Sequence, residues 1–350
     1  MRIHADEQIE RHLARQVVSV CKADWGDLST AGQGLCSLTL PAEPRPRSNR
    51  TRAITRRSLY RRIRDGYGLG HGAAYLAWLS LTRKNPSPES NQVVAFLPQL
   101  QRAAHYFSRG EYHTALLLLW LAVQDLREQY PLWPFDFPHP LEGAIGADGI
   151  DRPWCRGLLQ IAAAAGIDHG HVVGQRDMPY VATIDLLATA NIDGRLMLAG
   201  FSSKPIGEAN DDVKWRMLER LELERRYLEA IGARYRVTAS ALIPVLMAGQ
   251  LEWWLDCATL QFAPHLALQA EKFSELVTDR PDLSLVDAVA NACAKSKLSP
   301  ESGWLLFRHG AWTQMIDIDP SLPIITSEPI RRGGRALRSA IRVQLFGADW

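Results

Sequence analysis

The sequence predicts an α/β unit followed by a mainly helical C-terminal domain. Its 350 residues are enough for about two domains. Between residues 54 and 239 the expected elements run helix, strand, hairpin, helix, strand. From Ser240 onward the apolar spacing becomes that of helices. We therefore expect a boundary near residue 240, with a separate extension over residues 1–53.

The composition is that of an ordinary globular protein. Apolar residues make up 47% and charged residues 22%, which excludes a disordered, collagen-like or disulfide-scaffold protein. The longest apolar run, Ala115 to Val123, is too short for a bilayer, which requires about 20 residues. The N-terminus has no apolar signal core, and the five cysteines form no CxxC pair. These features predict a cytoplasmic protein with no membrane partner and no structural zinc site.

Arginine clusters lie outside the apolar segments. Residues 1–53 contain a Gly/Ser stretch and then a Pro/Arg-rich segment, which predicts a partly disordered extension. Arg45 to Arg64 holds nine arginines and no acid, and a basic tail follows residue 330. Such clusters attract phosphate backbones, although they are equally compatible with solvated termini.

The α/β unit begins with a glycine-rich segment and a buried helix. In Gly66 to Gly72 every second residue is glycine, which is not the spacing of a dinucleotide site. A flexible loop is the simpler expectation. Glu111 to Val123 is almost continuously apolar and predicts a buried helix. Asp125 to Tyr130 then predicts a short extended stretch.

A hairpin is the strongest local signal. Tyr180 to Thr189 has the β-branched and apolar residues of a strand, Asn191 to Gly194 supplies a turn, and Arg195 to Phe201 forms the return strand. A long helix over Asp211 to Ile231 and a strand over Ala233 to Ala239 follow.

The C-terminal domain contains a candidate helix-turn-helix. Ser284 to Lys295 and Glu301 to His309 are predicted helices separated by a break. Ala311 to Ile318 alternates like a strand and would be the wing of a winged helix. Two short helices with a polar break also occur in ordinary helical domains.

Asp185 is the first residue that suggests chemistry. It lies inside an apolar strand, and a buried carboxylate is costly unless it is paired or binds a metal. Lys204 ends the partner strand, and Ser202 stands two residues before it. This is the layout of metal-dependent nucleases. The Asp holds the cation, the main-chain carbonyl of Ser203 adds an oxygen, and the Lys orients or deprotonates the attacking water. The alternative is a structural Asp–Lys pair that closes the hairpin.

Two glutamates extend this pattern. Glu111 opens the buried helix, where an acid is also favourable for the helix dipole alone. Glu224 lies on the long helix beside an apolar stripe, from which it would meet Lys204 or water near the site. The alternative for Glu224 is an ion pair with Arg220 or Arg225.

Together these segments resemble TnsA, the endonuclease subunit of heteromeric cut-and-paste transposases. The matching segments occur in the family's order and span about residues 54 to 240. They are Arg61 to Leu79, Leu126 to Leu132, Thr183 to Leu187, Lys204-Pro205, and Leu218 to Tyr227.

The resemblance implies both a fold and an activity. It implies a restriction-endonuclease-like domain, a mixed sheet flanked by helices, over residues 54–239, and a winged-helix-like domain over residues 240–350. It implies hydrolysis of DNA at the 5′ ends of a transposon with Mg²⁺, for which Mn²⁺ is a possible substitute. The implied partners are transposon-end DNA, an RNase-H-like transposase subunit of the TnsB type, and an ATPase regulator of the TnsC type.

The family's functional residues map onto this chain one by one. Its catalytic Glu, Asp and Lys fall on Glu111, Asp185 and Lys204, and a helix acid linked to the site falls on Glu224. Ser202 departs from the usual Gln or Glu, and a neutral hydroxyl is a weaker ligand for a hard cation. The implied metal ligands are therefore Glu111, Asp185 and the main chain of Ser203, with Ser202 in doubt.

The residues predicted to contact DNA come from the first segment: Arg56, Arg57, Arg61, Arg62, Arg64 and His71. Two alternatives stay open. One is a catalytically weak or inactive subunit that binds DNA or a partner, and the other is a free-standing restriction- or repair-type nuclease.

Overall fold

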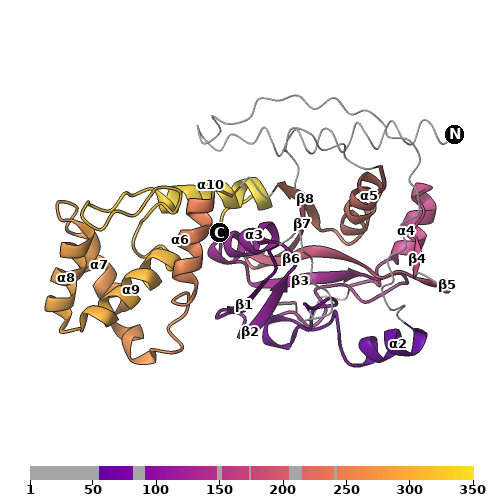
Figure 1. Ribbon diagram of the computed structural model, residues 1–350, viewed down its shortest axis with the longest axis horizontal. Coiled ribbons are helices and arrows are strands. Elements are labelled where there is room, and N and C mark those ends of the chain that lie inside the picture. The colour runs from indigo at the N-terminus through magenta and orange to yellow at the C-terminus, as the bar shows by residue number, and fades with distance from the viewer. Residues whose placement is uncertain (1–54, 82–90, 148–151, 173–174, 205–214, 240–242) are drawn as a thin grey trace.

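A mixed four-stranded sheet forms the centre of the computed structural model, which describes residues 55–81, 91–147, 152–172, 175–204, 215–239 and 243–350 (Figure 1). The expectations for residues 1–53 lie outside these ranges. The strand order is β3-β6-β7-β8, with β3·β6 and β6·β7 antiparallel and β7·β8 parallel. The strands span β3 (Asp125–Leu132), β6 (Ala182–Ile192), β7 (Arg195–Lys204) and β8 (Arg234–Ala239). The predicted mixed sheet flanked by helices is confirmed.

The predicted hairpin is formed by β6 and β7. Asp193 and Gly194 have φ of 50° and 78°, and two left-handed residues in a row match the twist of a tight hairpin. The return strand is longer than expected, because β7 continues to Lys204. Lys204 is therefore held by sheet pairing to Ala239 of β8.

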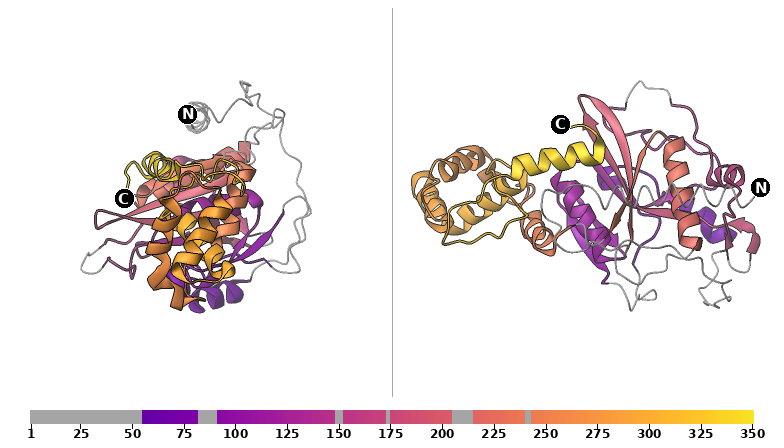
Figure 2. Two further views of the ribbon diagram at one scale, coloured as in Figure 1. Left: turned by 90° about the vertical axis from the view of Figure 1, so that its left-hand side faces the viewer. Right: turned by 90° about the horizontal axis from the view of Figure 1, so that it is seen from above.

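Helices cover both faces of the sheet. Helix α3 (Arg109–Trp120) lies on one face, and α5 (Trp215–Ala230) lies on the other (Figure 2). Every residue of α3 after Arg109 is buried, since α3 is covered on its outer side by the C-terminal helices α6 (Val245–Leu255) and α10 (Gly334–Phe346).

The C-terminal part shares a hydrophobic core with the sheet. Residues of α3, β6 and β7 and of the C-terminal helices belong to one buried cluster. Phe201 of β7 meets Phe346 of α10 with ring centroids 6.3 Å apart. Farther out lie η3 (Pro264–Gln269), α7 (Ala270–Thr278), α8 (Leu285–Ser296) and α9 (Pro300–Thr313).

The two helices of the expected helix-turn-helix are present as α8 and α9, but the strand expected over Ala311 to Ile318 is wrong. Ala311 belongs to the last turn of α9, which ends at Thr313 and is capped by Gln314 in a left-handed conformation with φ 64°. Consecutive Ala311 and Trp312 are both buried, as a helix between two layers allows and a half-exposed strand does not. No strand occurs among the described residues after Ala239.

Smaller elements border the sheet. They are α2 (Arg56–Arg64), η1 (Gly72–Ala74), β1 (Val93–Leu97), β2 (Arg102–Tyr106), α4 (Leu158–Ala165), β4 (His171–Val172) and β5 (Gln175–Pro179). No described helix combines the length and apolar character that crossing a bilayer requires.

Part of the glycine-rich segment packs closely against its surroundings. Its four alternate glycines all have φ between 51° and 89°, a backbone region that residues with a side chain rarely adopt. A Cβ on Gly68 would overlap the ring of Pro131 in β3, and one on Gly70 would lie 2.6 Å from the carbonyl oxygen of Ala74. The glycines therefore allow this loop to lie against the sheet.

Candidate active site

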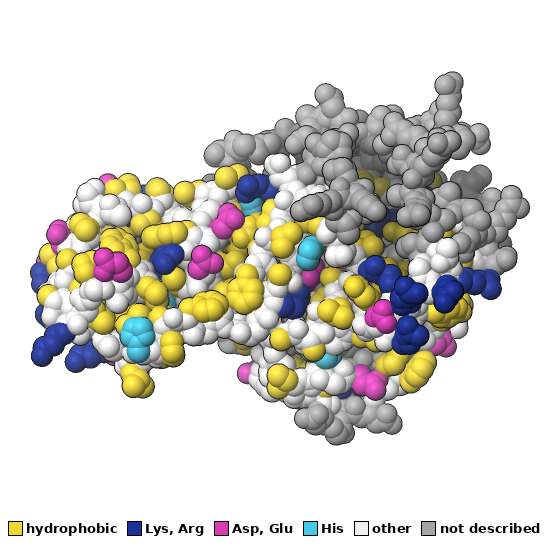
Figure 3. Space-filling view, turned by 60° about the horizontal axis from the view of Figure 1, so that its bottom comes forward, with side chains coloured by type: hydrophobic (Ala, Val, Ile, Leu, Met, Phe, Trp, Pro, Cys, Tyr) yellow, Lys and Arg dark blue, Asp and Glu magenta, His cyan; other side chains and the backbone are white. Residues whose placement is uncertain are grey.

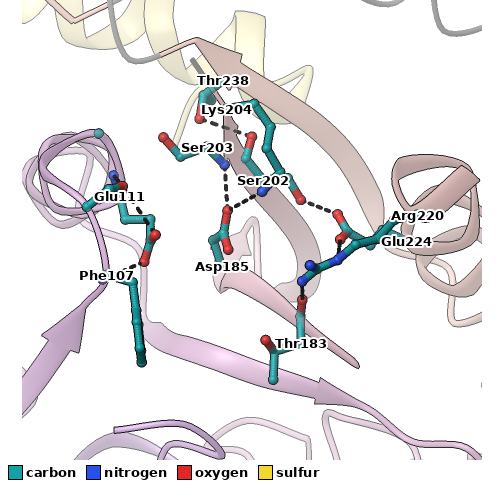
Figure 4. A network of polar contacts seen from close by, with 12 residues as sticks. Phe107, Glu111, Thr183, Asp185, Ser202, Ser203, Lys204, Arg220, Glu224 and Thr238 are labelled. Carbon is teal, nitrogen blue, oxygen red and sulfur yellow. Dashed lines mark hydrogen bonds and ion pairs between the residues drawn. The ribbon is translucent and has the colours of Figure 1, made fainter. Parts of the chain in front are cut away.

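Asp185 and Lys204 meet across the β6–β7 hairpin. Lys204 Nζ lies 3.0 Å from Asp185 Oδ2, and the main-chain N–H of Ser203 donates to the same oxygen at 2.8 Å (Figure 4). Both contacts end on Oδ2, so among the described residues Oδ1 stays available to a further ligand. The structure thus brings together the two residues that the sequence places on opposite strands.

Glu111 approaches the same region from α3. Its Oε2 accepts hydrogen bonds from the N–H of Phe107 at 3.0 Å and from Gln129 Nε2 at 3.2 Å. Ser108, the N-cap residue of α3, donates to Oε1 at 3.2 Å. A reciprocal cap of this kind is a local signal of a helix start, and it orients the carboxylate at the beginning of the helix.

The electrostatics of Glu111 reflect its neighbours. Burial, and after it the negative charge of Asp185, raise the pKa of Glu111 to about 7. Hydrogen bonds from Phe107 and Ser108 and the charge of Lys204 act in the opposite direction. The two carboxyl groups are thus close enough to repel each other, and a cation between them would relieve that repulsion.

Lys204 is held in its charged form. Burial lowers the pKa of Lys204, but the charges of Asp185 and Glu224 outweigh burial and keep it above its ordinary value. A protonated ammonium can orient a water molecule and offset charge on a phosphate. It cannot accept a proton before losing its own.

Ser202 and Glu224 form a second, buried network behind Lys204. Ser202 Oγ donates to Glu224 Oε2, and Tyr235 OH donates to the same oxygen at 3.0 Å. Arg220 Nε lies 3.2 Å from Glu224 Oε1. The ion pair with Arg220, one of the two alternatives for Glu224, is therefore present, while Arg225 pairs with Glu222 and Glu229.

This network separates Glu224 and Ser202 from the carboxylates. Ser202 is fully buried, and its hydroxyl is used by Glu224. The main-chain carbonyl of Ser202 accepts from Thr238 Oγ1 at 3.5 Å. Ser203 contacts Asp185 through its N–H. Glu224 influences Lys204 through its charge and has no direct contact with Asp185 or Glu111.

The donor set fits a hard cation. Within the ranges described, no group of three or more His, Cys, Asp or Glu side chains is arranged to hold a metal ion. The described residues place two carboxylates near each other here, those of Glu111 and Asp185. Mg²⁺ is commonly bound through one or two carboxylates and keeps several waters, so this set matches its preference.

The six residues expected to contact DNA divide into two groups. Arg56, Arg57, Arg61 and Arg64 are exposed on α2, none of whose residues is buried. Figure 3 shows basic side chains gathered at the end of the molecule where α2 lies. This helix begins with a side-chain cap from Thr55 and has no acid in its first turn.

Arg62 and His71 are used by the fold. Arg62 donates to the carbonyl oxygen of Trp78 and lies over the rings of Tyr67 and Trp78. His71 Nδ1 lies 3.2 Å from Asp125 Oδ2, and its Nε2 lies 2.9 Å from the carbonyl oxygen of Glu142. Both ring nitrogens of His71 are therefore engaged.

Sequence reasoning gave no role to the polar residues inside β3. Arg127 donates to the carbonyl oxygen of Pro140 at 3.0 Å, and Glu128 forms a buried ion pair with Arg102 at 2.6 Å. Gln129 contacts Glu111. The sequence did contain a signal, namely three successive polar residues, Arg127 to Gln129, inside a predicted extended stretch. In the structure this strand is buried throughout. Buried polar side chains need specific partners.

The chain was compared with known proteins. No protein-family model matches the chain. The chain is 27% identical over 228 residues to the transposon Tn7 transposition protein TnsA of Escherichia coli. The aligned region covers 65% of this chain and 72% of that protein. The chain is thus a TnsA-type relative, and the resemblance drawn from its motifs is confirmed.

Proposed function

We propose that this TnsA-type relative is a metal-dependent DNA endonuclease, the subunit of a transposase that hydrolyses the 5′ ends of a transposon. One observation carries the proposal. A buried Asp185 is paired with Lys204 beside a Glu111 whose pKa is raised by burial and by Asp185. Such perturbed, mutually close ionisable groups are a feature of catalytic sites more often than of structural ones.

Glu111 and Asp185 would hold Mg²⁺, with Mn²⁺ as a substitute, and the carbonyl of Ser203 would supply a further oxygen. The ion would neutralise charge on the phosphate and make bound water more acidic. Asp185 Oδ2 is already held by Ser203 N–H and Lys204 Nζ, so its carboxylate is oriented in advance. Ser202, whose hydroxyl is bound to Glu224, is not part of this set.

Lys204 would act as a cation. Its ammonium lies on Asp185, and from there it can orient the attacking water and offset charge that develops on the phosphate. Glu224 would be a positioning residue. Its charge helps to keep Lys204 protonated, and its bonds to Ser202 and Tyr235 fix the end of β7 that carries Lys204.

DNA would be bound along α2 by its exposed arginines. Helix α2 buries no residue of its own, and a strongly basic helix with little packing role fits a phosphate backbone. Helices α8 and α9, each begun by a serine cap, would form a further DNA- or partner-contacting unit of the helix-turn-helix kind without a wing strand. A TnsB-type transposase subunit and a TnsC-type ATPase would be the protein partners, acting in the cytoplasm.

The test is nicking of transposon-end DNA with Mg²⁺ and both partner subunits present. Lys204→Ala should lower the rate at least 100-fold, a typical contribution of a positioned acid–base or charged group. Lys272→Ala is the matched control, because Lys272 is exposed on α7. Cleavage by Lys204→Ala at the rate of the control would reject the role given to Lys204.

A second candidate is a DNA-binding subunit without cleavage activity. The burial of Ser202 against Glu224 favours it, because the strand position two before the Lys offers no ligand to a cation. This candidate predicts salt-sensitive DNA binding that neither Mg²⁺ nor Asp185→Ala alters. Cleavage that requires Mg²⁺ and Asp185 would exclude it.

A further inference from the structure

Gln129 has an unusual backbone for a residue inside a strand. Its φ is 47°, in the left-handed region, although it lies in the middle of β3 and is not a glycine. Non-glycine residues in this region are uncommon and strained, and they persist where the surroundings hold them. Gln129 is also almost completely buried, with 4% of its surface exposed.

Asp185 occupies the corresponding position of β6, where the β3–β6 pairing is interrupted. Glu128 pairs with Leu186 and Tyr130 pairs with Ile184, so the register places Gln129 across from Asp185 between the two pairs. Residues two apart in a strand normally share a face. Here Ile184 belongs to the core under α5, and Leu186 belongs to the core under α3.

The same change of face occurs on β3. Leu126 belongs to the core under α3, whereas Tyr130 and Leu132 belong to the core under α5. In both strands, therefore, the side chains of a given alternation change from one face of the sheet to the other at the Gln129–Asp185 position. A left-handed residue rotates the following peptide relative to the pleat, as in strand irregularities that redirect a side chain beside a functional site.

The side chain of Gln129 links the elements that carry the two carboxylates. Its Nε2 donates to Glu111 Oε2 of α3 at 3.2 Å, and its Oε1 accepts from Thr183 Oγ1 of β6 at 2.9 Å. Thr183 is two residues before Asp185 and is itself buried. Because the hydroxyl occupies the oxygen of the carboxamide, the NH₂ group is the end that faces Glu111.

We propose that Gln129 is a positioning residue of the metal site, which sets the placement of Glu111 relative to Asp185 through its carboxamide and its left-handed backbone. The inference rests on the proposed function. Since the hydroxyl of Ser202 is taken by Glu224, the described part of the site offers the carboxylates of Glu111 and Asp185, and their mutual placement affects how well a cation is held. Partners of this kind commonly change metal affinity 10- to 100-fold.

Gln129→Asn is the informative variant. Asparagine tolerates a left-handed backbone and keeps the carboxamide, but it is one methylene too short to reach Glu111 and Thr183 together. Gln101→Asn is the matched control, because Gln101 is also a left-handed glutamine, with φ 55°, exposed between β1 and β2. Thr183→Val is a second variant that removes only the hydroxyl supporting Gln129.

The measurements are Mn²⁺ affinity of the full chain by calorimetry and the Mg²⁺ concentration that gives half-maximal nicking with the partner subunits present. Gln129→Asn should weaken Mn²⁺ binding about 10-fold or more. It should raise the Mg²⁺ concentration for half-maximal nicking by a similar factor, and the nicking rate should recover at saturating Mg²⁺. Thr183→Val should shift both in the same direction by less. Gln101→Asn should shift neither, and a purely structural role for Gln129 would lower the melting temperature without changing Mn²⁺ affinity.

Two failures can be distinguished. Wild-type chain that binds Mn²⁺, with unchanged affinity in both Gln129→Asn and Thr183→Val, would overturn this inference and leave the proposed function intact. Wild-type chain that neither binds Mn²⁺ nor nicks DNA would overturn the proposed function and the inference with it.

Discussion

Glu111→Gln should make the protein more stable at alkaline pH while it removes metal binding. The substitution deletes the charge and keeps the shape. An amide oxygen at the place of Oε2 can still accept from Phe107 and Gln129, the two donors of that atom in the wild type. The change therefore isolates the free energy of holding a buried negative charge beside Asp185.

The expected difference in free energy of unfolding follows from the pKa of Glu111, which burial and then Asp185 raise from 4.5 to about 7. A difference of roughly 2.5 units corresponds to about 3 kcal/mol. Because the folded-state pKa lies above the unfolded value, the stability from this carboxyl is fully present below pH 4.5. It is lost as the pH rises through 7. The free energy of unfolding of Glu111→Gln should thus exceed that of the wild type by about 3 kcal/mol at pH 8. This difference should shrink toward pH 5.

The assay is urea unfolding of wild type and variant at pH 5 and pH 8, without divalent cations. Glu222→Gln is the control of opposite sign. Burial raises the pKa of Glu222, but hydrogen bonds from Arg225 and Arg226 outweigh burial and lower it, so this variant should lose stability at pH 8. Equal pH dependence of stability in wild type and Glu111→Gln would refute the reasoning about Glu111.

Two further predictions concern other parts of the molecule. Arg102→Ala should lower the free energy of unfolding, measured in urea, by about 3–5 kcal/mol, because it leaves Glu128 charged and buried without its partner. Recovery of stability in the double variant Arg102→Met/Glu128→Leu would support this cause, and no recovery would contradict it. Arg57→Ala with Arg61→Ala should lower the slope of log DNA affinity against log salt by about 2, measured by fluorescence anisotropy. An unchanged slope would show that α2 lies away from the DNA.

Local signals in the sequence were sufficient for the elements that carry the site. The turn at Asp193-Gly194 and the apolar strands around it predict the β6–β7 hairpin, and the hairpin register brings Asp185 near Lys204. The acid and the apolar run that follows it predict a helix from Glu111, and α3 begins two residues earlier, at Arg109, with Ser108 as its N-cap. These predictions succeed because turns, caps and short hairpins are decided by neighbours along the chain.

Other features depend on contacts between distant segments. Alternation over Ala311 to Ile318 predicted a strand, but burial between helices made its first residues the end of α9. The partner of Ser202 could not be known from β7 alone, because Glu224 reaches it from α5. The same holds for Gln129, whose partners lie on α3 and β6.

The sequence by itself determined which residue types stand at the ends of the strands and at the start of the buried helix, and with them the relation to TnsA. Only the tertiary structure decided that Glu111 is close enough to Asp185 to have its pKa raised, and that Ser202 is turned toward Glu224. The reason is that periodicity and turn chemistry act over a few residues. Charge coupling and buried hydrogen bonds depend on how segments about 20 to 75 residues apart pack against one another.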